Sequence, residues 1–317
     1  MVPVLKMKYL FVTAALLMPG FSCAFSPNAD LSVQIDPVGS DGAVPAQAQA
    51  AGFTLLAFES DFTRPFYAKA SNWLDCAGAS KPQWFRGAWP GFSNFAPCSQ
   101  IRQATDPLTG TPALEMIWLQ GEDHTSNSIG LFDSLKSDAR SGTFFTFYYV
   151  EVVARASRLS NNTGYALWTL APYTGIMFEF DGIEFVSGPW DSDAVMHNSS
   201  AVDYPAHPIW IGTMPTNISS WDPTQYNKYA WRVTSDGHTD SYFCQWINDT
   251  VTGCTTWGAT PSQIAPGTLN TLQLMISGTR GGSNAGELWV KSVKIYTCPF
   301  WSRRNMTAHC YSDRPNP

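Results

Sequence analysis

Short stretches of alternating apolar and polar residues run along most of this chain, which is the pattern of β-strands that bury one face. No segment carries its apolar residues at the 3.6-residue period of a helix. Strands are predicted over residues 113–119, 129–133, 143–156, 165–170, 176–185, 209–213, 229–234, 242–247, 272–278 and 287–296. Turn residues separate them, for example at Asp236-Gly237 and Asn248-Asp249. Many short strands without intervening helices predict an all-β fold, an antiparallel β-sandwich.

The first part of the chain departs from this pattern. Residues 1–24 have the features of a secretory signal peptide, with Lys6 and Lys8 ahead of an apolar run and Ser22-Cys23-Ala24 as the cleavage site. We therefore expect a secreted protein, extracellular or periplasmic. Residues 25–52 are rich in Ala, Ser, Gln and Pro without an apolar period, which predicts a flexible lead-in.

One large domain is expected over residues 53–298, followed by a C-terminal tail over residues 299–317. Only 14% of the residues are charged, against roughly 25% in typical soluble proteins, which suits a secreted β-protein with aromatic-lined surfaces. The net charge of −6 argues against a nucleic-acid partner, because such partners require a basic stripe. After the signal no segment is long and apolar enough to cross a bilayer, and we expect a monomer.

The cysteine count predicts disulfides. Seven cysteines are present, and signal cleavage would remove Cys23 and leave an even number in an exported chain. Sequence alone leaves the connectivity open, but nearest-neighbour pairing closes the shortest loops. That pairing joins Cys76 to Cys98, Cys244 to Cys254 and Cys298 to Cys310. There is no Cys-x-x-Cys spacing and His is scarce, so a zinc site is not expected.

One predicted strand carries three carboxylates within six residues, at Glu179, Asp181 and Glu184. Strict alternation places Glu179 and Asp181 on one face of the strand and Glu184 on the other. A β-bulge at Gly182 would add one residue and return Glu184 to the face of the other two acids. The sequence therefore predicts a bulge that gathers three acids on one face.

The aromatic residues of the same strand, Phe178 and Phe180, are predicted to lie buried behind the acids. The competing interpretation is an exposed edge strand whose acids serve solubility. Three like charges so close together repel, in a chain with few charges, so their concentration indicates a functional reason. Paired carboxylates are what glycoside hydrolysis requires.

The run Glu179-Phe180-Asp181-Gly182-Ile183-Glu184 resembles the bulged Glu-x-Asp-x-x-Glu signature of glycoside hydrolase family 16, the jelly-roll endoglycanases of the laminarinase, agarase, carrageenase and lichenase type. Further segments resemble strands of that family in the same order, over residues 58–62, 149–155, 164–170, 195–197, 226–232 and 287–296. The resemblance spans residues 53–298. It implies a jelly roll of the concanavalin A-like lectin/glucanase type.

The resemblance also implies a retaining, endo-acting β-glycoside hydrolase. Glu179 would be the nucleophile, Glu184 the acid/base, and Asp181 the acid that holds Glu179 and modulates its charge. Trp168 is a candidate floor for the sugar, with a core Trp as the alternative. His197 is a candidate contact to the substrate or to the acid/base, with a structural His as the alternative.

The substrate implied is a polysaccharide, and no cofactor is expected. Few Lys or Arg residues lie near the motif, which favours a neutral β-1,3- or mixed-linkage glucan over a sulfated one. Many family members carry a calcium-binding Asp where this chain has Lys291 or Ser292, so no metal is expected there. A non-catalytic carbohydrate-binding jelly roll and a transglycosylase on the same site are the alternatives. Five further Trp residues either pack or line outer subsites: Trp84, Trp89, Trp190, Trp210 and Trp231.

Overall fold

The computed structural model describes part of the chain. The described residues are 43–63, 84–86, 98–119, 126–131, 147–157, 163–170, 176–185, 192–200, 208–213, 221–235, 241–257, 271–278 and 285–297. The chain divides into two compact units, Met1–Ser32 and Val33–Pro317, and all of these residues lie in the second. The expected signal peptide at residues 1–24 and the expected tail at residues 299–317 lie outside the described residues.

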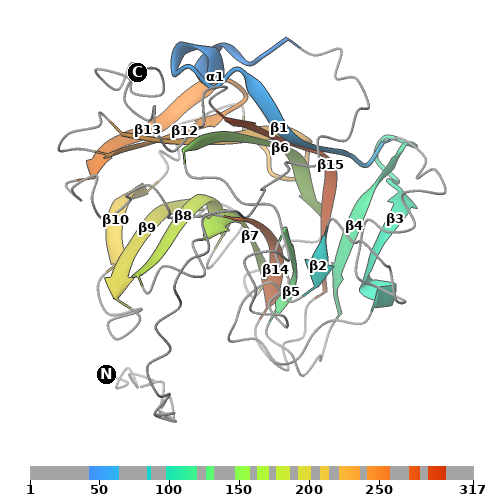
Figure 1. Cartoon of the computed structure of the whole chain (residues 1–317). Coiled ribbons are helices and arrows are strands. Elements are labelled where there is room, and N and C mark those ends of the chain that lie inside the picture. The colour runs from blue at the N-terminus through green and yellow to red at the C-terminus, as the bar shows by residue number, and fades with distance from the viewer. Residues whose placement is uncertain are drawn as a thin grey trace, which may run out of the picture. The chain divides into compact units, whose positions relative to one another are not determined.

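In the described part of the chain, two antiparallel sheets form a sandwich (Figure 1). The eight-stranded sheet has the order β13 (Thr250–Trp257), β12 (Ser241–Ile247), β11 (Asn227–Ser235), β6 (Tyr148–Ser157), β15 (Gly286–Thr297), β4 (Pro112–Trp118) and β3 (Ile101–Thr105), with β1 (Leu55–Asp61) also paired to β15. The seven-stranded sheet has the order β10 (Pro208–Thr213), β9 (Ser192–Ser200), β8 (Ile176–Phe185), β7 (Thr163–Leu170), β14 (Thr271–Gly278), β5 (Ser126–Gly130) and β2 (Phe85–Arg86). The predicted all-β antiparallel sandwich is confirmed.

The core lies between the two sheets and is built from the inward-facing positions of both. Its members include Leu114, Tyr148, Val150, Tyr165, Leu167, Phe180, Ile183, Trp231, Phe243, Leu272 and Leu274. Phe180 of β8 stacks on Phe243 of β12, with ring centroids 5.7 Å apart. Trp84 and Trp231 are fully buried here, so these two Trp residues pack the core and do not line outer subsites. Burial of each large apolar side chain contributes about 1.5–3 kcal/mol.

A short helix precedes the first strand, within residues assigned above to a flexible lead-in. Helix α1 (Ala46–Ala50) buries Ala48, and the next residue Ala51 is buried with it, against Tyr149 and Trp246 on the outer face of the eight-stranded sheet. The expectation of flexibility is therefore corrected for residues 43–52, because small Ala side chains let the helix approach these aromatic rings. A five-residue helix is too short to show a 3.6-residue period. Neither α1 nor the 3₁₀ helix η3 (Cys98–Gln100), the two helices of the described residues, has the length or the apolar stretch that crossing a membrane requires.

The predicted turn at Asn248 and Asp249 connects β12 to β13. Both residues have positive φ, 49° and 66°, as a type I′ hairpin turn requires, and Asn and Asp tolerate this conformation well. The side chain of Asn248 accepts a hydrogen bond from the backbone N of Lys228 at 2.9 Å and donates to Asn227 at 2.8 Å. These bonds tie the turn to the start of β11.

A disulfide joins Cys244 to Cys254 across the β12–β13 hairpin, where the two residues are directly paired. It is one of the three nearest-neighbour pairs expected from the sequence. Cys76, Cys298 and Cys310 lie outside the described residues, as does the side chain of Cys98.

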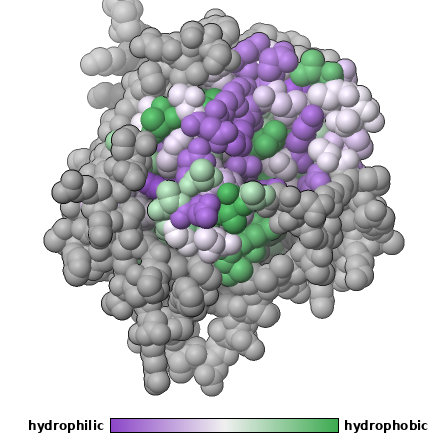
Figure 2. Space-filling view, turned by 90° about the horizontal axis from the view of Figure 1, so that it is seen from above, coloured by the Kyte–Doolittle hydropathy of each residue, from purple (hydrophilic) through white to green (hydrophobic). Residues whose placement is uncertain are grey.

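Charged side chains lie on the outer face of the eight-stranded sheet. Lys294 Nζ lies 3.5 Å from Glu59 Oε1, and Lys228 Nζ lies 2.5 Å from Asp249 Oδ1 and 3.9 Å from Glu151 Oε2. Figure 2 looks onto the molecule from above the view of Figure 1 and shows hydrophilic residues gathered in a band. These side chains are partly exposed to solvent, and ion pairs that water reaches contribute at most about 1 kcal/mol each. The pairs therefore mark the solvent side of the sheet.

A buried ion pair stabilises the connection between β3 and β4. Arg155 donates from Nη2 to Asp106 Oδ1 and from Nε to Oδ2, the latter at 3.3 Å, and the backbone N of Leu108 donates to Oδ1 at 2.9 Å. Both charged side chains are almost completely buried. Burial opposes the ionisation of Asp106, but the bonds from Arg155 and Leu108 outweigh it and hold the pKa of Asp106 at about 2.

Replacing Asp106 with Asn tests this ion pair through its pH dependence. The folded-state pKa lies below the value of about 3.9 in unfolded chains, so the carboxylate stabilises the fold above that pH and loses this effect as pH falls toward 2. Asp106→Asn should therefore lower the free energy of unfolding by roughly 2–3 kcal/mol near neutral pH and by much less near pH 2. Denaturant unfolding across this range measures it, with Asp222→Asn at an exposed turn as the control. A constant difference at every pH contradicts the assignment.

Candidate functional site

The pairing of β8 contains the extra residue that the acidic motif predicts. Trp168 of β7 pairs with Asp181, and the neighbouring Leu167 pairs with Ile183, so Gly182 is an additional residue on β8. The register between β8 and β9 shifts over the same stretch. One strand with two residues opposite one on its partner is a β-bulge. The bulge predicted at Gly182 is confirmed.

This register places the three acids on one face of the seven-stranded sheet. Residues that lie directly opposite in an antiparallel pair share a face. The partners of Glu179, Asp181 and Glu184 on β7 are, in that order, Leu170, Trp168 and Ala166. These three β7 residues alternate along their strand and so belong to one face. We call the side of the sheet that carries positions 179, 181 and 184 the acidic face.

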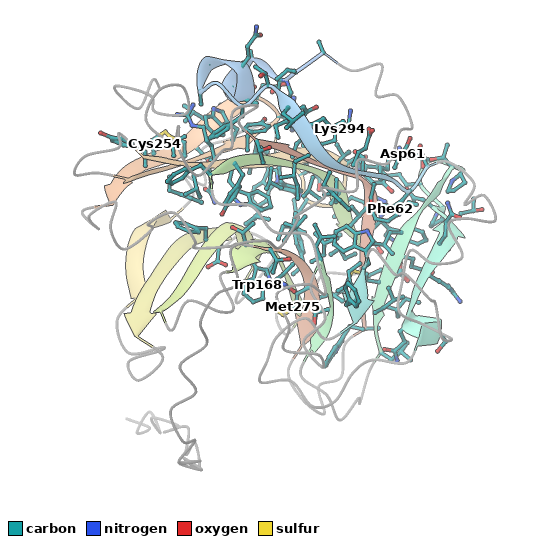
Figure 3. All side chains as sticks on the ribbon, viewed as in Figure 1. Asp61, Phe62, Trp168, Cys254, Met275 and Lys294 are labelled. Atoms are coloured by element: carbon teal, nitrogen blue, oxygen red, sulfur yellow. A yellow bond between two sulfur atoms is a disulfide. The ribbon has the colours of Figure 1, made fainter. Side chains whose placement is uncertain are left out.

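The acidic face is the side of the sheet turned away from the core. Ala166 and Trp168 pack with Met275 in a cluster separate from the core, and Trp168 and Met275 lie on the far side of the sheet in Figure 3. Phe180 and Ile183 of β8 belong instead to the core between the sheets. The predicted burial of Phe180 behind the acids is thus confirmed, and the side chain of Phe178 lies outside the described residues.

The register brings all five predicted site positions to the acidic face. Trp168 lies directly opposite Asp181, and His197 of β9 lies directly opposite Glu179. Trp168 is 4% exposed and Asp181 is 1% exposed, so both are enclosed on this face. The side chains of Glu179, Glu184 and His197 lie outside the described residues, and their backbone positions carry this assignment.

Trp231 of β11 packs against the backbone of Gly182 from the core side. A Cβ atom at position 182 would lie 2.2 Å from Cε3 of the indole, far inside the carbon–carbon contact distance of about 3.5 Å. Only glycine therefore fits at the bulge while Trp231 occupies its position. A residue of the eight-stranded sheet thus shapes the backbone between two acids on the other sheet.

Polar side chains in the core hold the backbone of β8 before the bulge. Thr169 Oγ1 donates to the carbonyl of Phe180 at 3.4 Å and accepts from Trp231 Nε1 at 3.4 Å. Tyr148 is also bonded to Thr169, and because the single hydroxyl hydrogen of Thr169 points to Phe180, Tyr148 is the donor. Burial raises the pKa of the Tyr148 phenol, and the negative charge of Asp181 raises it further, so the phenol keeps its proton.

Three carboxyl groups whose backbone positions share one face can perform acid–base chemistry. Close like charges raise the pKa of one member, which keeps a proton available while another member stays ionised. Among the described residues, no group of three His, Cys, Asp or Glu side chains could hold a metal ion. Lys291, one of the two residues expected at the place of a calcium ligand, has its Nζ 4.1 Å from the ring centroid of Tyr226.

Two polar positions on the acidic face escaped the sequence analysis. Gln273 of β14 pairs with Trp168, which pairs with Asp181, so the three residues lie side by side across neighbouring strands. Neither the oxygen nor the nitrogen of the Gln273 amide has a hydrogen-bond partner among the described residues. Asp193 of β9 pairs with Glu184. The alternation of polar and apolar residues around Gln273 was the available signal. Asp193 lies in a strand that was not predicted.

No family model matches this chain, and no curated protein matches it in sequence. Among solved structures, it resembles a GlcNAcα1-4Gal-releasing endo-β-galactosidase from Clostridium perfringens, with a TM-score of 0.54 and 15% identity over 82% of this chain and 65% of that one. A laminarinase from Flavobacterium sp. UMI-01 has a TM-score of 0.50 and 15% identity, covering 77% of this chain and 100% of that one.

A third similar structure is SCLam, a non-specific endo-β-1,3(4)-glucanase from family GH16. It has a TM-score of 0.50 and 15% identity, and the match covers 77% of this chain and 91% of that one. At such low identity these similarities establish the fold alone. The chain has the jelly-roll fold of family 16 glycoside hydrolases, as the resemblance of its motif implied.

Proposed function

We propose that this chain is a secreted, endo-acting, retaining β-glycoside hydrolase that cleaves a polysaccharide. The observation that carries the proposal is the bulge at Gly182, which brings positions 179, 181 and 184 to one face of a sandwich with the family 16 fold. Without the bulge, alternation would direct Glu184 toward the core. A core-facing carboxylate would be costly and useless for catalysis.

In the proposed double displacement, Glu179 attacks the anomeric carbon while Glu184 gives its proton to the departing glycosidic oxygen. Glu184 then removes a proton from a water molecule, which attacks the same carbon and releases Glu179. Retaining enzymes hold these two carboxyl groups about 5–5.5 Å apart. Asp181 lies between them on the same face, where in its protonated form it donates a hydrogen bond to the ionised Glu179. The negative charge of Glu179 in turn favours a protonated Glu184. The group titrates as a coupled set.

The proposed sugar-binding residues lie in the rows next to the acids. Trp168 offers an aromatic surface on which the apolar face of a sugar ring stacks. The backbone position of His197 lies opposite Glu179, and His197 is the proposed contact to the substrate or to the acid/base. Gln273 continues the row of Trp168 and has a buried amide without a described partner, so a sugar hydroxyl is its proposed partner.

The substrate class proposed is a neutral β-1,3- or mixed-linkage glucan. Two of the similar structures are described as a laminarinase and an endo-β-1,3(4)-glucanase, and the chain has few basic residues near the motif to bind sulfate. The test is incubation of the purified chain with laminarin, lichenan, agarose, carrageenan and xyloglucan, followed by product sizing. We expect mixed-length oligosaccharides from laminarin or lichenan at early times. Binding without cleavage of any polymer identifies a carbohydrate-binding protein, and longer products at high acceptor concentration identify a transglycosylase.

A further inference from the structure

A buried glutamine of the opposite sheet bonds to the backbone of the acidic strand at the bulge. Gln245 of β12 is 2% exposed, and its Nε2 donates to the carbonyl oxygens of both Asp181, at 2.7 Å, and Gly182, at 2.6 Å. An amide nitrogen has two hydrogens, so both are used on consecutive carbonyls of β8. The bonds cross the sandwich, since the two residues lie in different sheets.

The bulge creates the need for such a donor. A bulge interrupts the ladder of backbone hydrogen bonds, and a buried carbonyl without a donor is unfavourable. Position 245 lies between Phe243 and Ile247, both of which face the core, so alternation would place an apolar residue there. A glutamine at this inward position is explained by the two carbonyls that it serves.

A second bulge fixes the orientation of this glutamine. In β13, Gly253 pairs with Gln245 and Val251 pairs with Trp246, which makes Thr252 an additional residue. Thr252 Oγ1 donates to Gln245 Oε1 at 3.3 Å. That bond identifies the oxygen of the amide and leaves Nε2 to face β8.

Gln245 and Trp231 act on the same part of the acidic strand. They are directly paired neighbours on β11 and β12, and both contact the stretch from Asp181 to Gly182, one by hydrogen bonds and the other by packing of its indole. Together they satisfy the carbonyls of the bulge and leave no space for a side chain at position 182.

We infer that Gln245 is a positioning residue: through its two bonds to the bulge it sets the spacing of Glu179, Asp181 and Glu184 on the acidic face. The inference rests on the proposed function, because it assigns the acids a catalytic role. It makes the eight-stranded sheet, which carries none of the proposed catalytic groups, a determinant of the rate.

The variant Gln245→Met keeps the length of the side chain and removes both donors. We expect kcat on the cleaved glycan to fall by about 10²-fold, because displacement of a catalytic group by about 1 Å has an effect of that size. KM should change by less than about twofold, since binding by Trp168 is not altered. The control is Gln103→Met, which removes a glutamine bond to the backbone carbonyl of Phe62 at 2.9 Å in a distant part of the same sheet; it should keep the wild-type kcat.

A second measurement does not depend on hydrolysis. Carbon-13 NMR titration of the labelled Asp and Glu carboxyl groups, assigned with Glu179→Gln, Asp181→Asn and Glu184→Gln, reports the coupling among the three acids. In Gln245→Met at least one of these titrations should move by about one pH unit, and none should move in Gln103→Met. Unchanged titrations in a folded Gln245→Met overturn the inference, even if kcat falls. If the wild-type protein cleaves no glycan, the proposed function is refuted. The carboxyl titrations still show in that case whether Gln245 sets the spacing of the three acids.

Discussion

Replacing Glu179 with Gln is expected to lower kcat/KM on the cleaved glycan by at least about 10³-fold. The amide keeps the size and shape of the side chain but cannot form the glycosyl ester through which the proposed mechanism passes. Rates of product release from the polymer measure the effect. The control is Glu59→Gln, an acid of β1 that pairs with Lys294 on the outer face of the other sheet and should retain full activity.

Glu184→Gln separates the two carboxylates by their roles. Loss of the acid/base should abolish cleavage of the polymer but spare the first step on an aryl glycoside with an activated leaving group, which departs without a proton. Glu179→Gln should lose both reactions. If Glu179→Gln retained wild-type activity on the polymer, or if the two variants behaved alike on the aryl glycoside, the assignment of nucleophile and acid/base would be wrong.

Replacing Gly182 with Val is expected to have the largest effect on the fold. The first carbon of the new side chain would lie 2.2 Å from the indole of Trp231, so either the indole or the bulge must move. Overpacking of this kind costs about 3 kcal/mol or more when neighbours cannot yield. The Trp231 side chain is fully buried and bonded to Thr169, which leaves it little freedom. We expect a lower denaturation midpoint together with a loss of activity of at least about 10²-fold.

A double-mutant cycle shows whether the clash is the cause. Gly182→Ala, Trp231→Leu and the double variant should show a favourable coupling of about 0.5–3 kcal/mol in the free energy of unfolding, because the smaller Leu makes room for the new methyl group. Urea unfolding of the wild type, the two single variants and the double variant measures this coupling. Additive effects would mean that Gly182 is required for another reason than its contact with Trp231.

The acidic strand was the most predictable part of the molecule. Its bounds, Ile176–Phe185, agree with those predicted, because β-branched and aromatic residues alternate with acids along its length. The bulge was predictable because strict alternation would place Glu184 on the opposite face from Glu179 and Asp181. An extra residue at Gly182 returns Glu184 to their face. Local sequence thus contained both the strand and its irregularity.

Among the strands that were missed, β9 and β13 are strands because of pairing with their neighbours and not because of alternation in their sequence. β9 (Ser192–Ser200) is largely polar, yet it pairs with β8 on one side and β10 on the other. β13 (Thr250–Trp257) contains Gly253 and a run of Thr, and it is held by the hairpin from β12. Both strands are held by backbone hydrogen bonds to neighbouring strands. Such bonds do not require apolar and polar residues to alternate, so the sequence of these strands shows no period.

For Gln245, the strand and the buried side were predictable from the sequence, but its hydrogen-bond partner was not. The run Tyr242–Ile247 was predicted as a strand, and alternation already placed Gln245 on the apolar side with Phe243 and Ile247. A polar residue on a buried side indicates a buried partner. The identity of that partner, the backbone of a strand 63 residues away, depends on how the two sheets are superposed, which the sequence pattern does not encode.

The most direct test of the central claim is covalent trapping of the nucleophile. The chain is incubated with an activated 2-deoxy-2-fluoro glycoside of the glucan it cleaves, and the labelled peptide is located by mass spectrometry. The retaining mechanism on the acidic face predicts one glycosyl adduct, attached to Glu179, and its absence from Glu179→Gln. An adduct on another carboxylate, or turnover of the reagent to a product of inverted configuration without any adduct, would contradict it.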